Sequence, residues 1–526
     1  MDVVLVGAGA ASLMAAKVLL EDTSCQSKIR SVTIVEALDY VGGRIKGVSI
    51  IDDSGNEHVL DLGAELVHGW KTSLSDLIEE YQEELQGALM QTGEPLMQDF
   101  FVTSHGDGGP QSEPTDDSHL VGCYYIGKED LLLPYNTTDP DFLYLSRCIS
   151  NMEEIAGLHE EKKQSEDHFD FLNNNEERKC LSTRNPYSIG QYLLEDCRVA
   201  IRMKGLLNAS FSNTLGCADL CRVDLKRLNE MEEFWEQTEE EGDALLNSRI
   251  GMAGLIKILY QQLQKDSRFR IRLNYRVDTI YWNNHDKIRI VPESSTHEIF
   301  ADKVIVTVPP PVITSSRLKF DPPLPDWKQN AFQAVGMESA IKISLRMKQR
   351  SWPAHIQSVI SSEQPIPELW FRQISGEQNY LVVGFLTSKA ADQLRNYLRD
   401  ETQKNLDSDD NVTFDSHRVT QEKLVVDIVK EQLQCIFPNY TSSNVSDLEI
   451  ESCFIEDWGK VDTILGGYSY PTIGCTKQKY DEMAQPVQQQ LYFAGEATHT
   501  GATSTVQAAL DTGNRAAHQV LSSVKS

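Results

Sequence analysis

The chain has 526 residues, a formal net charge of −29 at pH 7, and 40% hydrophobic residues. This length predicts roughly two or three domains, and the apolar fraction is sufficient for sizeable cores. The negative charge argues against binding to nucleic acid or to an anionic membrane, and it favours either a cationic substrate or a solvated acidic surface. Because no apolar run reaches the about 18 residues of a membrane-spanning helix, we expect no membrane association.

Ten cysteines are scattered along the chain without metal-binding spacing, which predicts reduced structural thiols and no metal site. An apolar strand starts at Asp2, so we expect no signal peptide, and a cytoplasmic location is the default expectation. Acidic segments at 106–118, 160–179, 230–243 and 399–411 are expected to be surface loops or solvated helices. Nothing in the sequence predicts the oligomeric state.

The first patterned segment is MDVVLVGAGAASLMAAKVLL, which predicts a buried strand, a tight turn with Gly7 and Gly9, and a helix that begins near Ala11. Glycines leave no side chain between the backbone and an approaching group, and a helix N-terminus attracts anions. The pattern reads GxGxxS, with Ser12 where a third glycine or alanine is usual. On its own, this turn is also compatible with a strand-to-helix connection that binds nothing.

The residues that follow make a dinucleotide the predicted ligand. SVTIVEALD is a second predicted strand with Glu36 at its C-terminal end, where a carboxylate can accept hydrogen bonds from ribose hydroxyls. YVGGRI comes next, and its glycines permit close approach while Arg44 can neutralise a phosphate. Strand, glycine turn, helix, strand, acid and GGR together are far more specific than any one of these parts.

Five further segments follow in a characteristic order: VLDLGAELVHGW, NSRIGMAGLIKIL, IRLNYRVDTIYW, ADKVIVTVPPPVI and LYFAGEATHTGATSTVQAAL. In this order the chain resembles the flavin-dependent amine oxidases, the family of monoamine oxidases, polyamine oxidases and flavin lysine demethylases. The resemblance is closest to the polyamine (spermine or N1-acetylpolyamine) oxidases. It runs from end to end apart from insertions at 97–185 and 386–420.

The resemblance implies an α/β fold with two domains. One is a Rossmann-like FAD-binding domain of the GR2 type, assembled from residues 1–75, 245–310 and 450–526. The other is a mixed α+β substrate-binding domain, with a mixed sheet flanked by helices, from residues 76–244 and 311–449.

The resemblance also implies an FAD site. The residues that match the adenosine and pyrophosphate contacts are Gly7, Gly9, Ala10, Ala11, Ser12, Glu36, Gly43, Arg44 and, through its backbone, Val277. Those that match contacts to the flavin and ribityl chain are Gly63, Ala64, Gly495, Glu496 and Val506, and Trp458 is expected to pack nearby. Members with covalent flavin have a cysteine where this chain has Gly467, so we expect non-covalent FAD.

Lys342 lies in VGMESAIKISLRM, which alternates like a strand and would place one long cationic side chain on an otherwise apolar face. Buried lysines are rare, and most reach the surface with their charged end. The resemblance implies instead a lysine bound through water to flavin N5. A cation there would stabilise the charge that develops as electrons pass from the flavin to O2.

Four residues are predicted on the substrate side. Tyr468 matches one wall of an aromatic cage that orients the amine, and the opposite wall, aromatic in many relatives, falls at Thr505. Glu65 and His68 flank the flavin turn. The carboxylate would attract a substrate ammonium, and the histidine would help to keep the reacting nitrogen neutral, although a buried core histidine is an equally good interpretation.

We therefore predict FAD-dependent oxidation of small cationic amines, foremost polyamines such as spermine, spermidine or their acetylated forms. Hydride passes to the flavin, water hydrolyses the resulting imine, and O2 reoxidises the flavin to give H2O2. One alternative is a flavin oxidase of L-amino acids, monoamines or methyl-lysine. Another is an FAD-binding protein of the same fold that has lost turnover, because fold does not guarantee function.

Overall fold

The computed structural model describes residues 1–23, 28–87, 89, 95–99, 121–134, 137–150, 188–215, 219–228, 230–231, 240–282, 287–294, 297–374, 379–406, 413–440, 448–501 and 503–525. Two of the predicted acidic segments, 106–118 and 160–179, lie outside these residues, as does most of 230–243. Within the described ranges, no helix is both long and apolar enough to cross a membrane.

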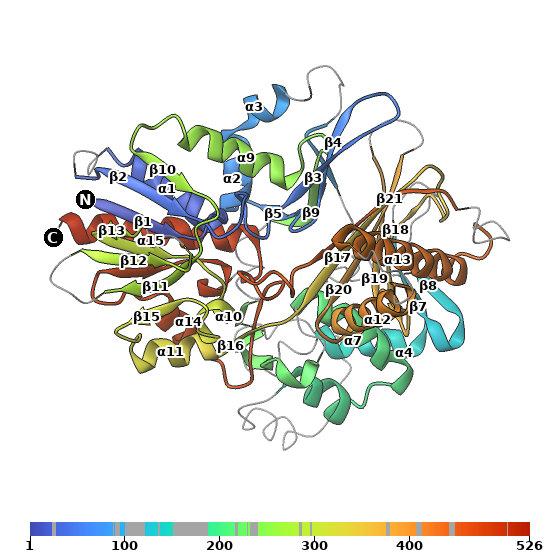
Figure 1. The fold of residues 1–526 in the computed structure, drawn as a ribbon. Coiled ribbons are helices and arrows are strands. Elements are labelled where there is room, and N and C mark those ends of the chain that lie inside the picture. The colour runs from blue at the N-terminus through green and yellow to red at the C-terminus, as the bar shows by residue number, and fades with distance from the viewer. Residues whose placement is uncertain are drawn as a thin grey trace.

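A five-stranded parallel sheet forms the centre of the first domain (Figure 1). Its strands, in spatial order, are β10 (Phe269–Arg272), β2 (Ser31–Val35), β1 (Asp2–Val6), β14 (Lys303–Val306) and β23 (Leu491–Phe493). They come from three separated parts of the chain. The predicted GR2-type, Rossmann-like arrangement is therefore present, with the N- and C-terminal segments in one sheet.

Both faces of this sheet are covered, which explains why β1 is apolar throughout. Val3 and Leu5 pack in a core with α1 (Ala10–Glu21), α9 (Gly251–Leu263) and α15 (Val506–Lys525). Val4 and Val6 point the other way, toward a four-stranded sheet of β13 (Ile299–Ala301), β12 (Ile288–Pro292), β11 (Val277–Tyr281) and β15 (Lys319–Asp321).

Three helices lie near the four-stranded sheet: α10 (Pro310–Thr314), α11 (Asp326–Gln333) and α14 (Lys477–Ala484). Side chains such as Val312 and Phe332 belong to the core that this sheet shares with β1. These residues therefore pack with the first domain, although they follow the sequence-predicted boundary at residue 310.

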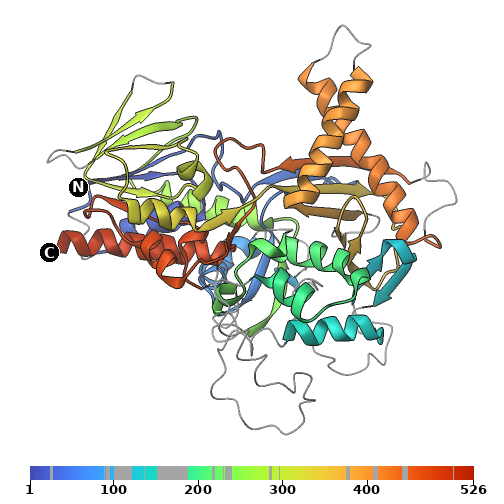
Figure 2. The ribbon, with the colours of Figure 1, turned by 90° about the horizontal axis from the view of Figure 1, so that it is seen from below.

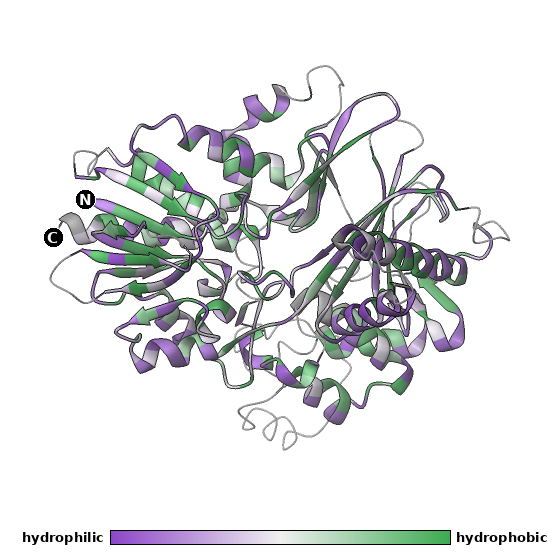
Figure 3. Ribbon diagram, viewed as in Figure 1, coloured by the Kyte–Doolittle hydropathy of each residue, from purple (hydrophilic) through white to green (hydrophobic). Residues whose placement is uncertain are grey.

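A seven-stranded mixed sheet forms the second domain. Its order is β21 (Ile450–Asp457), β17 (Ala340–Met347), β20 (Tyr380–Thr387), β19 (Glu368–Gln373), β18 (Ile356–Ser362), β7 (Val121–Ile126) and β8 (Leu131–Pro134). Only the β18–β7 pair of this sheet is parallel. Figure 3 shows hydrophobic residues on the strands of the sheets and on helices that cover them. The predicted mixed sheet is confirmed.

Helices cover one face of this sheet. Ile341 and Ile343 of β17 pack against α12 (Ser388–Leu406) and α13 (Phe414–Ile436), which project together from the body of the molecule (Figure 2). The predicted acidic segment 399–411 is helical through Leu406. Two further helices, α4 (Pro140–Ser150) and α7 (Lys204–Leu215), contribute to a separate core on the opposite face of β7, where Tyr124 and Ile126 lie.

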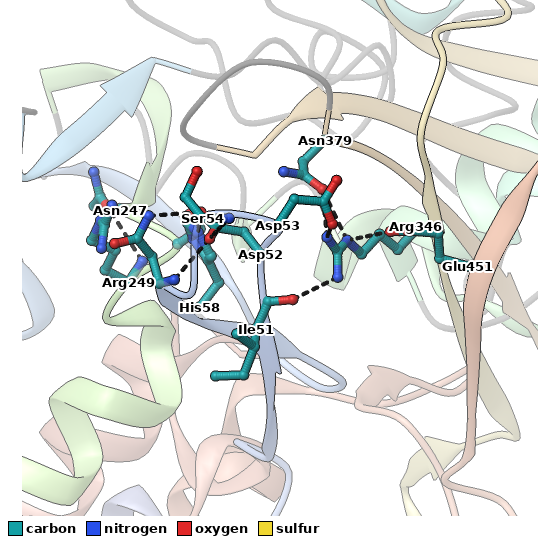
Figure 4. Close-up of polar contacts among 12 residues, drawn as sticks. Ile51, Asp52, Asp53, Ser54, His58, Asn247, Arg249, Arg346, Asn379 and Glu451 are labelled. Atoms are coloured by element: carbon teal, nitrogen blue, oxygen red, sulfur yellow. Dashed lines mark hydrogen bonds and ion pairs between the residues drawn. The ribbon is translucent and has the colours of Figure 1, made fainter.

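A hairpin of β3 (Gly47–Ile51) and β4 (Glu57–Asp61) connects the two domains (Figure 4). Arg346 of β17 donates to the Ile51 carbonyl at 2.7 Å and is paired with Glu451 at 2.9 Å. On the other side, His58 is fully buried and lies 2.9 Å from Ser248 Oγ, just before α9. The hairpin is therefore fixed to both domains.

Two small sheets and two further helices add to these elements. These are β5 (Leu66–Trp70), β6 (Met97–Asp99) and β9 (Glu240–Leu246) in one small sheet, β16 (Val335–Met337) and β22 (Ser469–Pro471) in another, and the helices α2 (Ser73–Glu80) and α3 (Gln82–Gly87), whose apolar side chains join the core of the first domain.

Candidate active site

The turn between β1 and α1 begins with a glycine in a conformation that other residues rarely adopt. Gly7 has φ of +106°, and a Cβ on it would lie 2.7 Å from Thr307 Oγ1, so a side chain is excluded here. Gly9 caps α1 without a side-chain hydrogen bond, and the helix continues with the buried Ala10 and Ala11. The helix N-terminus thus presents backbone N–H groups, which suit an anion.

Ser12 explains the departure from the usual glycine pattern. Its side chain is fully buried, and its Oγ lies 2.8 Å from Thr307 Oγ1 at the end of β14. The Thr307 hydroxyl in turn donates to the Val6 carbonyl at 2.9 Å. The serine therefore makes a helix-to-strand contact at a position where glycine or alanine usually allows close packing.

The glycine pair Gly42–Gly43 packs directly against Gly9 of the first turn. Gly9 and Gly42 form an isolated parallel bridge, and a Cβ on Gly43 would lie 3.3 Å from the Gly9 Cα atom. The buried Glu36 carboxylate accepts from the Ala8 N–H at 2.6 Å and the Leu38 N–H at 2.8 Å, and burial raises its pKa. The cradle and its acid thus fit the nucleotide part of a dinucleotide.

Val277, the predicted adenine contact, follows a segment that is hydrogen-bonded to the backbone of Glu36, and the contact itself stays a prediction. Val277 is buried at the start of β11, two residues after Tyr275, whose N–H donates to the Glu36 carbonyl at 2.7 Å.

Arg44 and Glu496 join the first and last motifs of the chain. Arg44 Nη1 lies 3.0 Å from Glu496 Oε1 and donates to the Gly467 carbonyl at 2.5 Å. Glu496 Oε2 accepts from Ser469 Oγ at 2.6 Å and from the Ser504 N–H at 2.9 Å. Gly495 precedes this acid with φ of +120°.

The turn at Gly63 is tightly packed against the same arginine. A Cβ on Gly63 would lie 1.8 Å from the Arg44 carbonyl oxygen and 3.1 Å from the Trp458 ring. The Ala64 N–H donates to that carbonyl at 3.1 Å, and Trp458 Nε1 donates to the Leu62 carbonyl at 3.1 Å. Trp458 therefore packs on the turn, while Val506 begins α15 and is buried.

Lys342 lies inside the protein beside this turn. Its Nζ donates to the Gly63 carbonyl at 2.9 Å and lies 2.7 Å from Glu65 Oε1. Glu65 Oε2 accepts from Arg372 Nη2 at 2.6 Å. Burial lowers the pKa of Lys342, whereas the two cations, Arg372 and Lys342, lower that of Glu65 against the effect of burial. The Glu65 carboxylate is thus paired with two cations of the protein. Its expected attraction of a substrate ammonium stays a prediction.

Tyr468 forms one end of a row of three aromatic rings. Its ring stacks on Phe385 at 6.3 Å between centroids and 18° between planes, and Phe385 stacks on Trp370 at 6.0 Å. Burial and the nearby Glu368 carboxylate raise the pKa of Tyr468 well above its usual value, so its hydroxyl stays neutral. Glu368 is fully buried and accepts from Trp370 Nε1 at 2.7 Å.

His68 and Thr505 both lie next to α15: His68 contacts it through its backbone, and Thr505 directly precedes it. The His68 carbonyl in β5 accepts from Gln507 Nε2 of α15 at 3.2 Å. Thr505 Oγ1 accepts from the Ala508 N–H at 3.2 Å and so caps that helix. Small residues hold the preceding loop in place: Ser504 has φ of +73° and donates to the Ser469 carbonyl at 2.5 Å.

The structure adds residues that sequence reasoning did not find. Phe385 and Glu368 lie in one cross-strand row with Lys342, because Lys342 pairs with Phe385 and Phe385 pairs with Glu368. Arg372 lies on the same face of β19, four residues beyond Glu368. The available signal was the alternation of ELWFRQ, but the strand register that aligns it with Lys342 is not readable from local sequence.

The fold and the site define a dinucleotide-binding oxidoreductase domain joined to a mixed-sheet domain that completes the site. The profile of the flavin containing amine oxidoreductases matches residues 13–521, and the chain belongs to this family. The family uses flavin as its cofactor, and the glycine cradle, Glu36 and the Arg44–Glu496 pair fit FAD.

Comparisons with individual proteins agree with this assignment. The chain is 25% identical to "Lysine-specific histone demethylase 1 homolog 3" of Arabidopsis thaliana, over 100% of this chain and 30% of that protein. It is 28% identical to "Probable polyamine oxidase 5" of the same plant, over 48% of this chain and 52% of the relative. It is 26% identical to the "Peroxisomal N(1)-acetyl-spermine/spermidine oxidase" of Bos taurus, over 52% and 54%. The alignments thus span between 30% and 54% of these relatives.

Two solved structures share the fold along the full length. Cyclohexylamine oxidase from Brevibacterium oxydans superposes with a TM-score of 0.69 at 15% identity, covering 100% of this chain and 99% of that chain. Putrescine oxidase bound to putrescine gives 0.67 at 17% identity, with 99% of both chains covered.

Proposed function

We propose that this protein is an FAD-dependent oxidase of amines that carry a second cationic group, foremost polyamines. The observation that carries this proposal is the fully buried Glu368 beside the Tyr468–Phe385–Trp370 row. The negative charge of this carboxylate would attract a second ammonium of a substrate whose reacting amine lies at the aromatic row. The names of several relatives and of one solved structure, which refer to polyamines and putrescine, also support this choice.

The residues of the first domain would hold the cofactor. The β1–α1 turn, Gly43 and Glu36 would bind the nucleotide, and the Arg44–Glu496 pair would contact its central part. When bound, the flavin supplies the two-electron chemistry that oxidises the carbon next to nitrogen and returns the electrons to O2 as H2O2.

Attachment of the flavin would be non-covalent. The position before Tyr468 is Gly467, and a Cβ there would lie 2.7 Å from the Ala340 Cβ atom. A cysteine side chain at this position would therefore require the neighbouring strand to move. Release of the flavin by acid precipitation would test the proposal, because covalently attached flavin would stay with the pellet.

The second domain would orient the amine and set its protonation. The rings of Tyr468 and Phe385 offer flat apolar walls to an alkyl chain and its amine. A poorly solvated pocket disfavours the charged form of the reacting nitrogen, which must be neutral to release a hydride from its neighbouring carbon. Glu368, at the other end of the row, would take the distant ammonium.

The experiment that tests the function is anaerobic bleaching of the flavin absorbance by spermine, N-acetylspermine, spermidine, benzylamine and a mixture of L-amino acids. Bleaching by polyamines alone is expected. Glu368→Gln should then raise the KM for a polyamine at least about tenfold while changing that for a simple alkyl monoamine little. Equal effects on both amines would contradict the role of Glu368.

A protein-bound methylated lysine is the second candidate substrate. The alignment with the demethylase homologue covers the whole chain, whereas those with the polyamine oxidases named above cover about half of it. A dimethyl-lysine histone peptide in the same bleaching assay distinguishes the two: bleaching by the peptide and not by polyamines would replace the first proposal with the second.

A further inference from the structure

Lys342 is enclosed by a pair of charged residues from two other parts of the fold. Glu65 lies in the turn before β5, and Arg372 lies on β19. The Lys342 and Glu65 side chains are 2% and 4% exposed. The protonation state of each therefore depends on neighbouring groups of the protein and not on solvent.

One carboxylate serves two cations here. Glu65 uses Oε1 for Lys342 at 2.7 Å and Oε2 for Arg372 at 2.6 Å. The Lys342 ammonium is also fixed in place, because it donates to the Gly63 carbonyl at 2.9 Å. Glu65 is the only carboxylate within ion-pairing distance of Lys342 in the part of the chain that the structure describes.

The other charged groups around Lys342 cannot replace Glu65. Asp61 of β4 accepts from the Met252 and Ala253 N–H groups at 2.7 and 3.0 Å, and burial beside Glu65 raises its pKa to about 6. Glu456 of β21 faces Lys342 across the strand pair but is engaged by Lys46 at 2.7 Å.

Glu368 of β19 lies in the same cross-strand row, beyond Phe385, and binds the Trp370 indole. Without Glu65, a buried ammonium would therefore face the Arg372 guanidinium with no paired anion, and a buried lysine in that situation loses its proton.

We propose that Glu65 is a positioning residue that holds Lys342 against the Gly63 turn and keeps it protonated, in competition with Arg372 for the same carboxylate. This inference rests on the proposed function and on the role that the resemblance to the amine oxidases implies for Lys342, a cation next to the flavin that promotes the transfer of electrons to O2. It assigns to Glu65 a role inside the protein instead of contact with a substrate ammonium.

The test is a pH titration of the oxidised flavin absorbance in the FAD-loaded protein, without any amine. A charged group beside the flavin changes its spectrum when it titrates. In Glu65→Gln we expect the one-proton transition of Lys342 at least about one pH unit below its position in the wild type. The transition should vanish in the double variant Glu65→Gln/Lys342→Met, which assigns it to the lysine.

Two variants act as controls. Glu65→Asp keeps the negative charge and should largely restore the wild-type transition. Glu456→Gln also replaces a glutamate with glutamine. Glu456 lies directly opposite Lys342 on the neighbouring strand but is paired with Lys46, so this variant should leave the transition unchanged. A transition at the wild-type pH in Glu65→Gln, or one that persists in the double variant, would overturn the proposal.

If Glu65→Gln does not fold or bind FAD, Arg372→Met gives the opposite test. Removing the competing cation should shift the Lys342 transition to higher pH, and an unchanged or lower value would contradict the proposal. Because no amine is present, a failure of any amine to bleach the flavin would count against the proposed function alone.

Discussion

Arg44 and Glu496 lie 452 residues apart in the chain and form an ion pair at 3.0 Å. The arginine follows the second glycine turn, and the glutamate follows β23. The Glu496 side chain is 5% exposed, so the two terminal segments of the chain are joined by a charge pair inside the protein.

Loss of Arg44 should weaken FAD binding. Arg44→Met removes the cation that would neutralise a cofactor phosphate, and loss of such a buried, hydrogen-bonded charge contact costs about 3 kcal/mol of binding free energy, which corresponds to roughly a hundredfold increase in the FAD dissociation constant. Flavin fluorescence on dilution measures this constant. The matched control is Arg30→Met, because Arg30 is 70% exposed and pairs with Asp2 away from the site. Equal losses in both variants would show that the effect is not local.

Lys342 should matter for the reaction with O2 more than for the oxidation of the amine. In Lys342→Met, anaerobic flavin reduction is expected to stay within a few-fold of the wild type, whereas reoxidation slows by about tenfold to a hundredfold. Stopped-flow absorbance separates the two half-reactions in one protein, so each serves as the control for the other. Slowing of reduction alone would be the contrary result.

The ring of Tyr468, rather than its hydroxyl, should determine activity. The hydroxyl is neutral and the ring stacks on Phe385. Tyr468→Phe is therefore expected to keep kcat/KM within a few-fold, and Tyr468→Ala should lower it at least about tenfold by removing the wall. Steady-state H2O2 release measures both. A large loss in Tyr468→Phe would instead assign a role to the hydroxyl.

The contact between Arg346 and the β3–β4 hairpin should contribute strongly to stability. Arg346→Met leaves the Glu451 carboxylate and the Asn379 amide oxygen, now bound at 2.9 and 2.6 Å, without their donor. We expect the free energy of unfolding to fall by about 3 kcal/mol, measured in urea. Arg418→Met on α13, where the arginine is 58% exposed, should change it by no more than about 0.5 kcal/mol.

Acid should destabilise the protein partly through His499. Burial, with Arg515 and Arg227 nearby, lowers the pKa of His499 to about 4 from the 6.5 of an exposed histidine. The unfolded chain therefore takes up this proton first as the pH falls. Stability from the neutral ring is complete above about pH 6.5 and decreases by about 3 kcal/mol on acidification to about pH 4.

His499→Asn provides the control for this pH dependence. The His499 Nδ1 accepts from the Gly501 N–H at 2.9 Å, and an asparagine oxygen can accept that bond without titrating. The free energy of unfolding of this variant should decrease less steeply between about pH 6.5 and about pH 4. A slope equal to that of the wild type would assign the acid sensitivity to other groups.

The nucleotide-binding half of the site was predictable because its signals are local. Gly7 has a positive φ that favours glycine, Gly9 and Glu36 belong to the same short strand–turn–helix–strand pattern, and the apolar run of β1 reflects a strand covered on both faces. The burial of Ser12 could not be inferred in the same way, because its partner Thr307 comes from a distant strand.

By itself, the sequence determined the parallel-sheet domain and the dinucleotide cradle, since each depends on short segments with a characteristic pattern, whereas the candidate positions of Lys342 and Tyr468 came from the resemblance to the amine oxidases. Only the tertiary structure decided what surrounds those two residues. Phe385 reaches Lys342 and Tyr468 through the register of β17 and β20. Glu65 and Arg372 meet at 2.6 Å although 307 residues separate them. Strand register and domain packing arise from contacts distant in the chain, and no local pattern encodes them.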